Sequence, residues 1–270
     1  MSNIHVHNLQ SLFTKLLKDF YLWFHYNLQL YLAGWVPKKN LVGLSERIFV
    51  LDFFGSKKLR GSGLNIPSSR ILTAFNATSE NSFLGYYIDE KKEKDKDKKK
   101  SMVTKKLQGV VWAKENKHLD GKNKLLESVA DKVTLISTSQ IDSFHHKNIT
   151  WVGHQSPEEW HSLLSESKFL LGLGSPLLGP SAIDAVAAGC MYINPIYSEP
   201  FAHNDQLFNS QHPYAVEKVG EPYVCSYKEN DFISLQKCID KAREAELVPY
   251  IPYDFTKAAY RKRVRTIFNL

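Results

Sequence analysis

The residues best suited to chemistry form a glycine-containing loop that leads directly into a helix. The loop extends from Gly174 to Gly179, and Pro180 and Ser181 begin the helix. Glycine lets a backbone approach a ligand closely, and the free amides at a helix start suit a diphosphate. One turn into the helix, the Asp184 carboxylate is placed to accept hydrogen bonds from ribose hydroxyls. The pattern predicts a nucleotide-binding loop, although a strand–loop–helix unit that binds nothing has the same appearance.

The elements that must position this loop alternate between short β-type runs and helical runs. Strands are expected at 109–115, 132–138, 148–153, 169–174, 190–195 and 222–227, and helices at 119–131, from 157, at 181–189, at 231–245 and at about 254–268. The run 169–174 is continuously apolar, which is typical of a parallel strand buried on both faces. The alternation predicts an α/β fold with a doubly wound parallel (Rossmann-like) sheet, whose ligands bind beyond the carboxyl ends of the strands.

The first 108 residues do not follow this alternation. Residues 1–62 contain one good strand, at 47–53. Between 12 and 36, apolar residues recur at roughly helical spacing from Leu12 to Phe24, and the apolar stretch 19–36 is interrupted by polar residues too often for a membrane span. Residues 63–108 are expected to form a loop-rich connection with a charged insert at 89–106. The predicted organisation is an incomplete N-terminal segment, this connection, and a ligand-binding domain at 109–270.

The composition narrows the function classes. The 270 residues carry a formal charge of +7, but the insert 89–106 contributes +4 and residues 257–265 contribute +5, so the rest of the chain sums to −2. A protein that binds nucleic acid usually has basic side chains distributed over one folded face. Here the positive charge is confined to two segments, so direct nucleic-acid binding is not expected. The three cysteines, Cys190, Cys225 and Cys238, form no CxxC metal motif, and a buried free thiol is the default expectation for each.

Several longer segments occur in an order that resembles a known family. They are RIFVLDFFG (47–55), NSFLGYYI (81–88), LLGLGSPLLGPSAIDAVAAGCMYINP (170–195), SQHPYAV (210–216) and VPYIPYDFT (248–256). Together they resemble the C-terminal half of the alpha-1,6-mannosylglycoprotein 6-beta-N-acetylglucosaminyltransferase family, whose members have the two-domain GT-B glycosyltransferase architecture. The resemblance covers about 47–270 and is densest at 168–256.

The resemblance implies a reaction and a cellular location. N-acetylglucosamine is transferred from UDP-N-acetylglucosamine to the 6-hydroxyl of an α-linked mannose of N-glycans on glycoproteins, with inversion and without a metal or other cofactor. A carboxylate deprotonates the acceptor hydroxyl, and the protein stabilises the departing diphosphate. The family's members lie on the luminal side of the Golgi membrane, and two sequons, at Asn76 and Asn148, permit such a location.

The same resemblance suggests roles for individual residues. It places a cation near the diphosphate, the uracil ring at the end of the third strand, and the phosphates at the turn before the helix. Lys114 is the cation. The residues at the uracil ring are Trp151, Gly153 and His154, and those at the phosphates are Gly174, Gly179, Pro180 and Ser181. A solvated strand-end lysine, a core tryptophan and a surface histidine are the alternative interpretations of Lys114, Trp151 and His154. The motif from Gln211 to Tyr214 matches the family and is also consistent with a packed turn.

Three positions depart from the family pattern. Leu178 stands where the family has Glu before Gly-Pro, Asp184 replaces a longer Glu, and Ile196 replaces a basic residue. No residue matches the catalytic carboxylate, which the family carries in its N-terminal domain. Three hypotheses therefore stay open: a fragment or shortened member of this transferase family, a nucleotide-sugar-binding module without turnover, and a GT-B hexosyltransferase with another acceptor.

Overall fold

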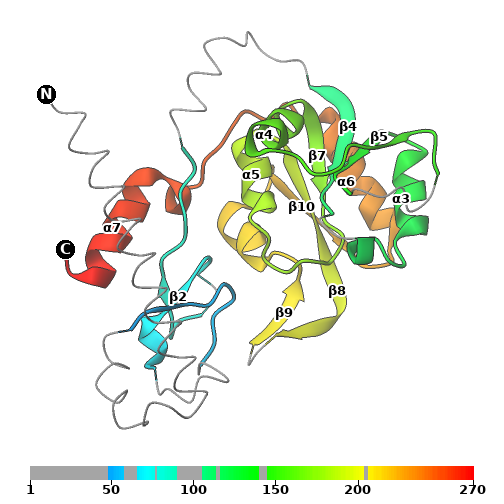
Figure 1. Cartoon of the computed structure of the whole chain (residues 1–270). Coiled ribbons are helices and arrows are strands. Elements are labelled where there is room, and N and C mark those ends of the chain that lie inside the picture. The colour runs from blue at the N-terminus through cyan, green and yellow to red at the C-terminus, as the bar shows by residue number, and fades with distance from the viewer. Residues whose placement is uncertain are drawn as a thin grey trace, which may run out of the picture.

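The computed structural model describes residues 48–57, 66–76, 78–89, 105–113, 116–139, 145–203 and 206–270. The helical pattern at 12–36, Lys114 and residues 90–104 of the charged insert lie outside these described residues. What the structure describes falls into a large α/β unit and a small sheet, which are seen side by side in Figure 1.

A seven-stranded sheet forms the centre of the α/β unit. Its strands are β4 (Lys106–Val111), β5 (Thr134–Ser137), β6 (Ile149–Trp151), β7 (Ser167–Leu171), β8 (Met191–His203), β9 (Gln206–Ser210) and β10 (Val224–Lys228). Their order is β10-β8-β7-β4-β5-β6, all parallel, and β9 pairs antiparallel with β8. The chain moves outward from β4 first to one side and then to the other. This order confirms the predicted doubly wound parallel sheet.

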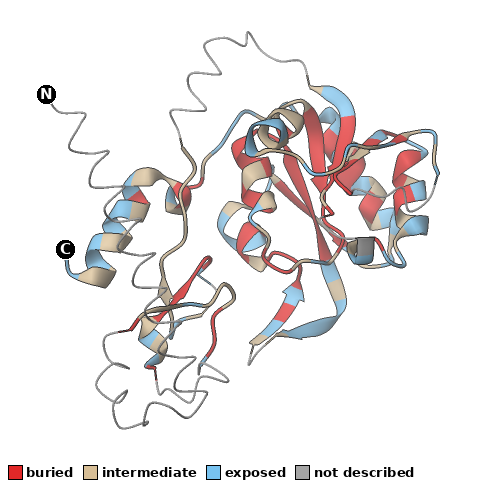
Figure 2. Cartoon of the chain, viewed as in Figure 1, coloured by how far each residue is buried: buried red, intermediate tan, exposed pale blue. Residues whose placement is uncertain are grey.

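Helices cover both faces of this sheet. They are α3 (Asn123–Ala130), α4 (Pro157–Ser165), α5 (Ser181–Ala187) and α6 (Phe232–Glu244). Helices α3 and α6 pack over one hydrophobic cluster and α4 and α5 over a second, so both faces of the sheet are covered. In Figure 2 the central strands are largely red, the colour of buried residues. Helix α4 begins with the expected Ser156 cap, which forms a capping box with Glu159.

Glycine makes the central contact of the sheet possible. Strand β7 is buried along its whole length, and the apolar run predicted at 169–174 overlaps its last three residues. A Cβ atom on Gly109 of β4 would lie only 2.2 Å from the ring of Phe169 in β7. Because Gly109 has no side chain, the aromatic ring packs directly against the neighbouring backbone.

The small sheet consists of three short parallel strands. They are β1 (Val50–Leu51), β2 (Ile71–Thr73) and β3 (Ser82–Phe83), in the order β1-β2-β3. The strand predicted at 47–53 is therefore only two residues long in the described part. The connection predicted to be loop-rich contributes β2, β3 and a 3-10 turn, Ser68–Arg70.

The basic C-terminal helix, α7 (Lys257–Phe268), packs against this small sheet. Arg263 donates to the carbonyls of Leu84 and Asp254, at 2.8 and 2.6 Å, and its guanidinium lies 4.3 Å from the ring centre of Phe83. The ring of Phe268 meets that of Phe49 with centres 4.8 Å apart. Part of the positive charge of residues 257–265 is thus used in packing.

The C-terminal end of the charged insert is also structured. Lys106 begins β4, and the ammonium of Lys105 donates to the carbonyls of Leu164, Ser165, Ser167 and Ala188, at 3.0–3.5 Å. These two residues of the insert therefore belong to the α/β unit and not to the loop-rich connection in which they were expected. Helices leave carbonyls at their carboxyl ends without intrahelical partners, and the half-buried Lys105 ammonium donates to such carbonyls of α4 and α5.

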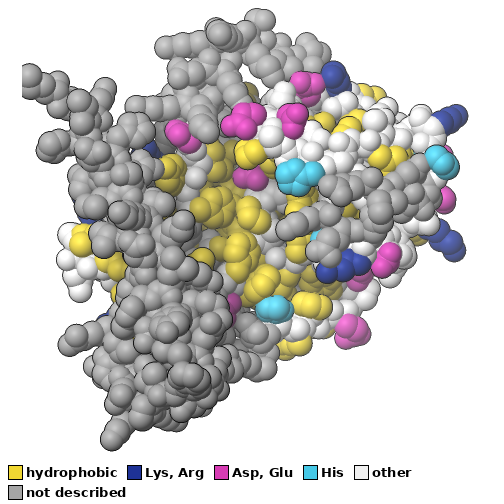
Figure 3. Space-filling view, in the orientation of Figure 1, with side chains coloured by type: hydrophobic (Ala, Val, Ile, Leu, Met, Phe, Trp, Pro, Cys, Tyr) yellow, Lys and Arg dark blue, Asp and Glu magenta, His cyan; other side chains and the backbone are white. Residues whose placement is uncertain are grey.

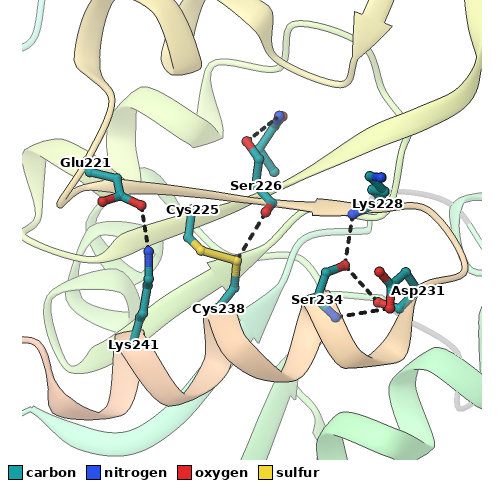
Figure 4. Close-up of a disulfide and its surroundings, with 9 residues drawn as sticks. Glu221, Cys225, Ser226, Lys228, Asp231, Ser234, Cys238 and Lys241 are labelled. Carbon is teal, nitrogen blue, oxygen red and sulfur yellow. Dashed lines mark hydrogen bonds and ion pairs between the residues drawn. A yellow bond between two sulfur atoms is a disulfide. The ribbon is translucent and has the colours of Figure 1, made fainter.

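The expectation of free thiols is wrong for two of the three cysteines. Cys225 of β10 and Cys238 of α6 form a disulfide that ties the helix to the edge of the sheet (Figure 4). The Lys241–Glu221 ion pair, at 2.6 Å, lies one turn further along the helix. Cys190 is free and buried, and burial raises the pKa of its thiol to about 12.

Removing this disulfide is expected to lower the free energy of unfolding by about 2–3 kcal/mol, since it links two residues that lie 13 positions apart. The variant Cys225→Ala/Cys238→Ala would be compared with the unaltered chain by urea unfolding. Cys190→Ala, which removes a buried thiol without breaking a cross-link, is the matched control. A reductant should destabilise the unaltered chain and leave the double variant unchanged. Equal sensitivity of both to the reductant would contradict the assignment.

Candidate functional site

A pocket of about 740 Å³ lies at the carboxyl ends of the parallel strands. This volume falls within the range of about 300–1,000 Å³ that is typical of small-molecule sites. The pocket spans the gap between β4 and β7, where the strand order reverses and doubly wound sheets bind their ligands. The lining residues are Trp112, Thr138, His154, Gln155, Pro157, Trp160, Pro176, Gly179, Pro180, Ser181 and Asp184.

The structure brings five of the predicted site residues together in this pocket. They are His154, Gly179, Pro180, Ser181 and Asp184. Lys114 lies outside the described residues.

Three predicted residues are described but do not line the pocket. Trp151 packs against the core under α3 and α6, which is the alternative interpretation of this residue. Gly153 forms the turn after β6 with a φ of +69°, a conformation that glycine adopts readily. Gly174 lies next to Tyr197 and Glu229, whose side-chain atoms would be 3.6 and 3.7 Å from a Cβ atom placed on this glycine.

Asp184 is held in place by a tryptophan. Trp160 of α4 donates from its indole Nε1 to Asp184 Oδ2 at 3.3 Å, and both side chains line the pocket. The bond leaves the carboxylate with further acceptor positions for ligand hydroxyls. Asp184 also borders a neighbouring pocket of about 250 Å³, lined by the half-buried Tyr86. Burial of its hydroxyl, and then the charge of Asp184, raise the pKa of Tyr86.

The loop between β7 and α5 has a fixed and unusual shape. Its Ser175–Pro176 peptide bond is cis, and Leu178 has a φ of +51°. The Leu178 side chain is fully buried and packs into the core under α4 and α5. The position where the resemblance would place a glutamate therefore contributes a core side chain.

The pocket is poor in positive charge. Among its described lining residues, none is Lys or Arg, and Asp184 is acidic. A described lysine, Lys122, lies close to the loop: its Nζ would be 4.0 Å from a Cβ atom placed on Gly174. The same Nζ forms an ion pair with Glu229 at 3.3 Å. In the described residues, no group of three His, Cys, Asp or Glu side chains is placed to hold a metal ion.

The Lys and Arg side chains visible in the space-filling view do not form a continuous patch (Figure 3). Hydrophobic side chains gather instead over the middle of this face. Within the part of the chain that the structure describes, no helix has the length and hydropathy needed to cross a bilayer.

Sequence reasoning missed two tryptophans and one glutamine that shape the site. Trp112 directly follows β4, and its ring stacks on His118 with centres 5.7 Å apart. Its position after a central strand was a usable signal, because ligand contacts gather there. Trp160 lies on the same face of its helix as two leucines, Leu163 and Leu164, so the sequence does not single it out. Gln211, described below, stands in a motif that is also consistent with a packed turn.

The strand order and the switch-point pocket define a Rossmann-like domain of the kind that binds nucleotides beyond its strand ends. A family model described as glycosyltransferase family 18 matches residues 51–269. The chain belongs to glycosyltransferase family 18, a family of enzymes.

Curated relatives share about a quarter of their residues with this chain. Alpha-1,6-mannosylglycoprotein 6-beta-N-acetylglucosaminyltransferase B of Mus musculus is 27% identical over 266 residues, which cover 86% of this chain and 34% of that enzyme. The A enzyme of Cricetulus griseus is 26% identical over 221 residues, which cover 76% of this chain and 29% of that enzyme. The chain thus spans about a third of the length of the curated relatives that it matches.

A solved structure of UDP-GlcNAc 2-epimerase from Methanocaldococcus jannaschii, in complex with UDP-GlcNAc and UDP, is also similar. It has a TM-score of 0.42 and 13% identity, and the match covers 67% of this chain and 49% of that one. At this score the likeness adds nothing to the fold, which rests on the strand order.

Proposed function

We propose that this chain forms the nucleotide-sugar half of an inverting, metal-independent N-acetylglucosaminyltransferase. The donor is UDP-N-acetylglucosamine, and the acceptor is the 6-hydroxyl of an α-linked mannose in N-glycans. The names of the relatives support this reaction. The observation that carries the proposal is the pocket at the point where the strand order reverses. There the Asp184 carboxylate, hydrogen-bonded to Trp160, and the glycine-containing loop line the same cavity.

Several of the described residues that line the pocket are assigned roles in donor binding. Asp184 accepts hydrogen bonds from the ribose hydroxyls, and the flat rings of Trp112 and Trp160 supply apolar walls. The backbone from Gly179 to Ser181 approaches the diphosphate. As the cation that offsets the charge of the diphosphate we propose Lys114, the residue that the family resemblance places there.

No described residue is assigned the role of catalytic base. Asp184 is the acidic residue among the described lining residues, and its bond to Trp160 fits binding better than proton transfer. A nucleotide-sugar-binding module without turnover is therefore the second candidate function. The buried Leu178 favours it, since a leucine in the core cannot orient a sugar hydroxyl.

The proposed location is the lumen of the Golgi, at its membrane. The Cys225–Cys238 disulfide supports an oxidising compartment, because cytosolic thiols are kept reduced. Of the two sequon asparagines, Asn76 is exposed, whereas Asn148 donates to the carbonyl of Ala130 at 2.8 Å. Asn76 is the better candidate for glycosylation.

The proposal is tested by calorimetric titration with UDP and UDP-N-acetylglucosamine. No heat at millimolar ligand would overturn both the enzyme and the binding module. An assay on a biantennary glycan acceptor then separates the two, since only the enzyme gives turnover.

Replacing Asp184 with Ala is expected to weaken UDP binding about tenfold, because two or so hydrogen bonds to ribose are lost. Glu158→Ala is the matched control. It removes another carboxylate near the site, from a residue that lines only the neighbouring smaller pocket. Equal dissociation constants for UDP in the two variants would remove Asp184 from the binding site.

A further inference from the structure

One glutamine holds most of the glycine-containing loop. Gln211 Oε1 accepts the N–H of Gly174 at 2.9 Å, and its Nε2 donates to the carbonyl of Pro176 at 2.9 Å. Its backbone carbonyl accepts the N–H of Leu178, also at 2.9 Å. A single buried residue thus satisfies polar groups on three of the five residues from 174 to 178.

Gln211 is itself fixed from three sides. Its N–H donates to the carbonyl of Pro195 in β8 at 3.0 Å. A Cβ atom on Gly172 would lie 2.6 Å from Gln211 Oε1, so the side chain fits only because this position is glycine. The next residue, His212, donates its N–H to Asn194 Oδ1 at 2.9 Å. The glutamine therefore cannot shift without disturbing β8.

The antiparallel strand β9 explains how this residue reaches the loop. Strand β9 ends at Ser210, immediately before Gln211, and Ser210 pairs with Ile196 of β8. The strand returns the chain along β8 to the carboxyl ends of the central strands. Tyr197 of β8 donates its hydroxyl to the carbonyl of Gly174 at 2.7 Å, and Gln211 supplies the hydrogen bonds of Pro176 and Leu178 from a distant part of the sequence.

We propose that Gln211 is a positioning residue that presets the loop between β7 and α5 for binding a nucleoside diphosphate. This inference rests on the proposed function. A loop rich in glycine loses much conformational freedom when it is ordered on a ligand, and a loop that is already ordered binds more tightly. Gln211 does not line the pocket of about 740 Å³. It acts through Gly174, Pro176 and Leu178.

The test compares two glutamines at either end of the same strand. Gln206 of β9 also donates to two carbonyls, those of Phe54 and Gly55, at 2.9 and 2.8 Å, but these lie next to the small sheet. Gln211→Ala is expected to raise the dissociation constant for UDP about tenfold, while Gln206→Ala changes it less than about twofold. Thermal unfolding of both variants shows whether their stabilities match. Uridine, which lacks the phosphates, should bind both variants equally.

A second variant provides a signature that a structural role alone does not give. In Gln211→Glu, a protonated carboxyl can still accept from Gly174 and donate to Pro176, whereas an ionised one would face the Pro176 carbonyl with an oxygen. UDP affinity of this variant should therefore fall, relative to the unaltered chain, as the pH rises from about 5.5 to about 8.5. The variant also keeps the shape of the side chain if Gln211→Ala fails to fold.

The outcomes separate this inference from the proposed function. A failure of the unaltered chain to bind UDP would overturn the proposed function, and this inference with it. UDP binding that Gln211→Ala and Gln206→Ala weaken equally, or a Gln211→Glu variant with the pH dependence of the unaltered chain, would overturn only the role of Gln211.

Discussion

Replacing Phe75 with Ala is expected to lower the free energy of unfolding by about 3–5 kcal/mol, as truncating a fully buried aromatic ring does. Phe75 follows β2 of the small sheet, and its side chain is completely buried. Its ring centre lies 4.7–6.0 Å from those of five other aromatic side chains, namely Phe53, Tyr86, His212, Tyr214 and Phe255. These side chains come from the small sheet, the connection, the turn after β9 and the segment before α7. Phe75 therefore joins the small sheet to the α/β unit.

The measurement is urea unfolding, followed by far-ultraviolet circular dichroism. Phe201→Ala is the control, since Phe201 lies on the β8–β9 hairpin and remains about half exposed. Its removal should cost less than about 1 kcal/mol, as surface substitutions generally do. A similar loss of stability in both variants would show that the aromatic cluster does not join the two parts.

The α/β unit could be predicted because its signals are local. A continuous apolar run, such as that of β7, and a cap, such as that of Ser156, fix an element from its own residues. Their alternation then leaves few possible topologies, and the doubly wound sheet is one of them. The place of the site follows from the topology, which is why the loop before α5 was found.

The small sheet and the disulfide depend on distant partners, so sequence patterns did not indicate them. Asn81 holds the small sheet through its side chain, which accepts from the N–H of Ser56 and donates to the carbonyls of Ser56 and Ser68. Strands of two or three residues have too little periodicity to be recognised. Nothing in the spacing of Cys225 and Cys238 distinguishes a pair from two free thiols.

The site was only partly predictable for the same reason. Asp184 could be proposed from its position one turn into a helix after a glycine-containing loop. Its partner Trp160 lies 24 residues before it in the sequence. Gln211, which holds the loop, lies 37 residues after Gly174 and 35 after Pro176. Such side-chain contacts depend on how helices and strands pack, which the hydrophobic pattern of each element does not specify.

His212 is expected to make the protein lose stability in acid, at up to about 1.4 kcal/mol per pH unit below pH 6.5. Its ring is fully buried, and Nδ1 accepts the N–H of Ala215 at 3.0 Å, so the neutral ring carries its proton on Nε2. Burial lowers the pKa from 6.5 to about 3, although backbone groups of His212 and Gly179 offset part of the effect. Phe75, Tyr192 and Tyr214 surround the ring, and none of them is a charged partner.

The sign of the effect follows from which state binds the proton. Between pH 6.5 and about 3, the unfolded chain protonates this histidine and the folded chain does not, so unfolding takes up a proton. The contribution of His212 is therefore fully present above pH 6.5 and falls by about 3 kcal/mol on going to about pH 4.

Urea unfolding at a series of pH values measures this slope. Asn at position 212 can still accept from Ala215 but does not titrate, so His212→Asn should flatten the slope, while His154→Asn, at an exposed histidine, should not. An NMR titration in which the His212 ring of the folded chain protonates near pH 6.5 would contradict the prediction, even if the Asn variant fails to fold.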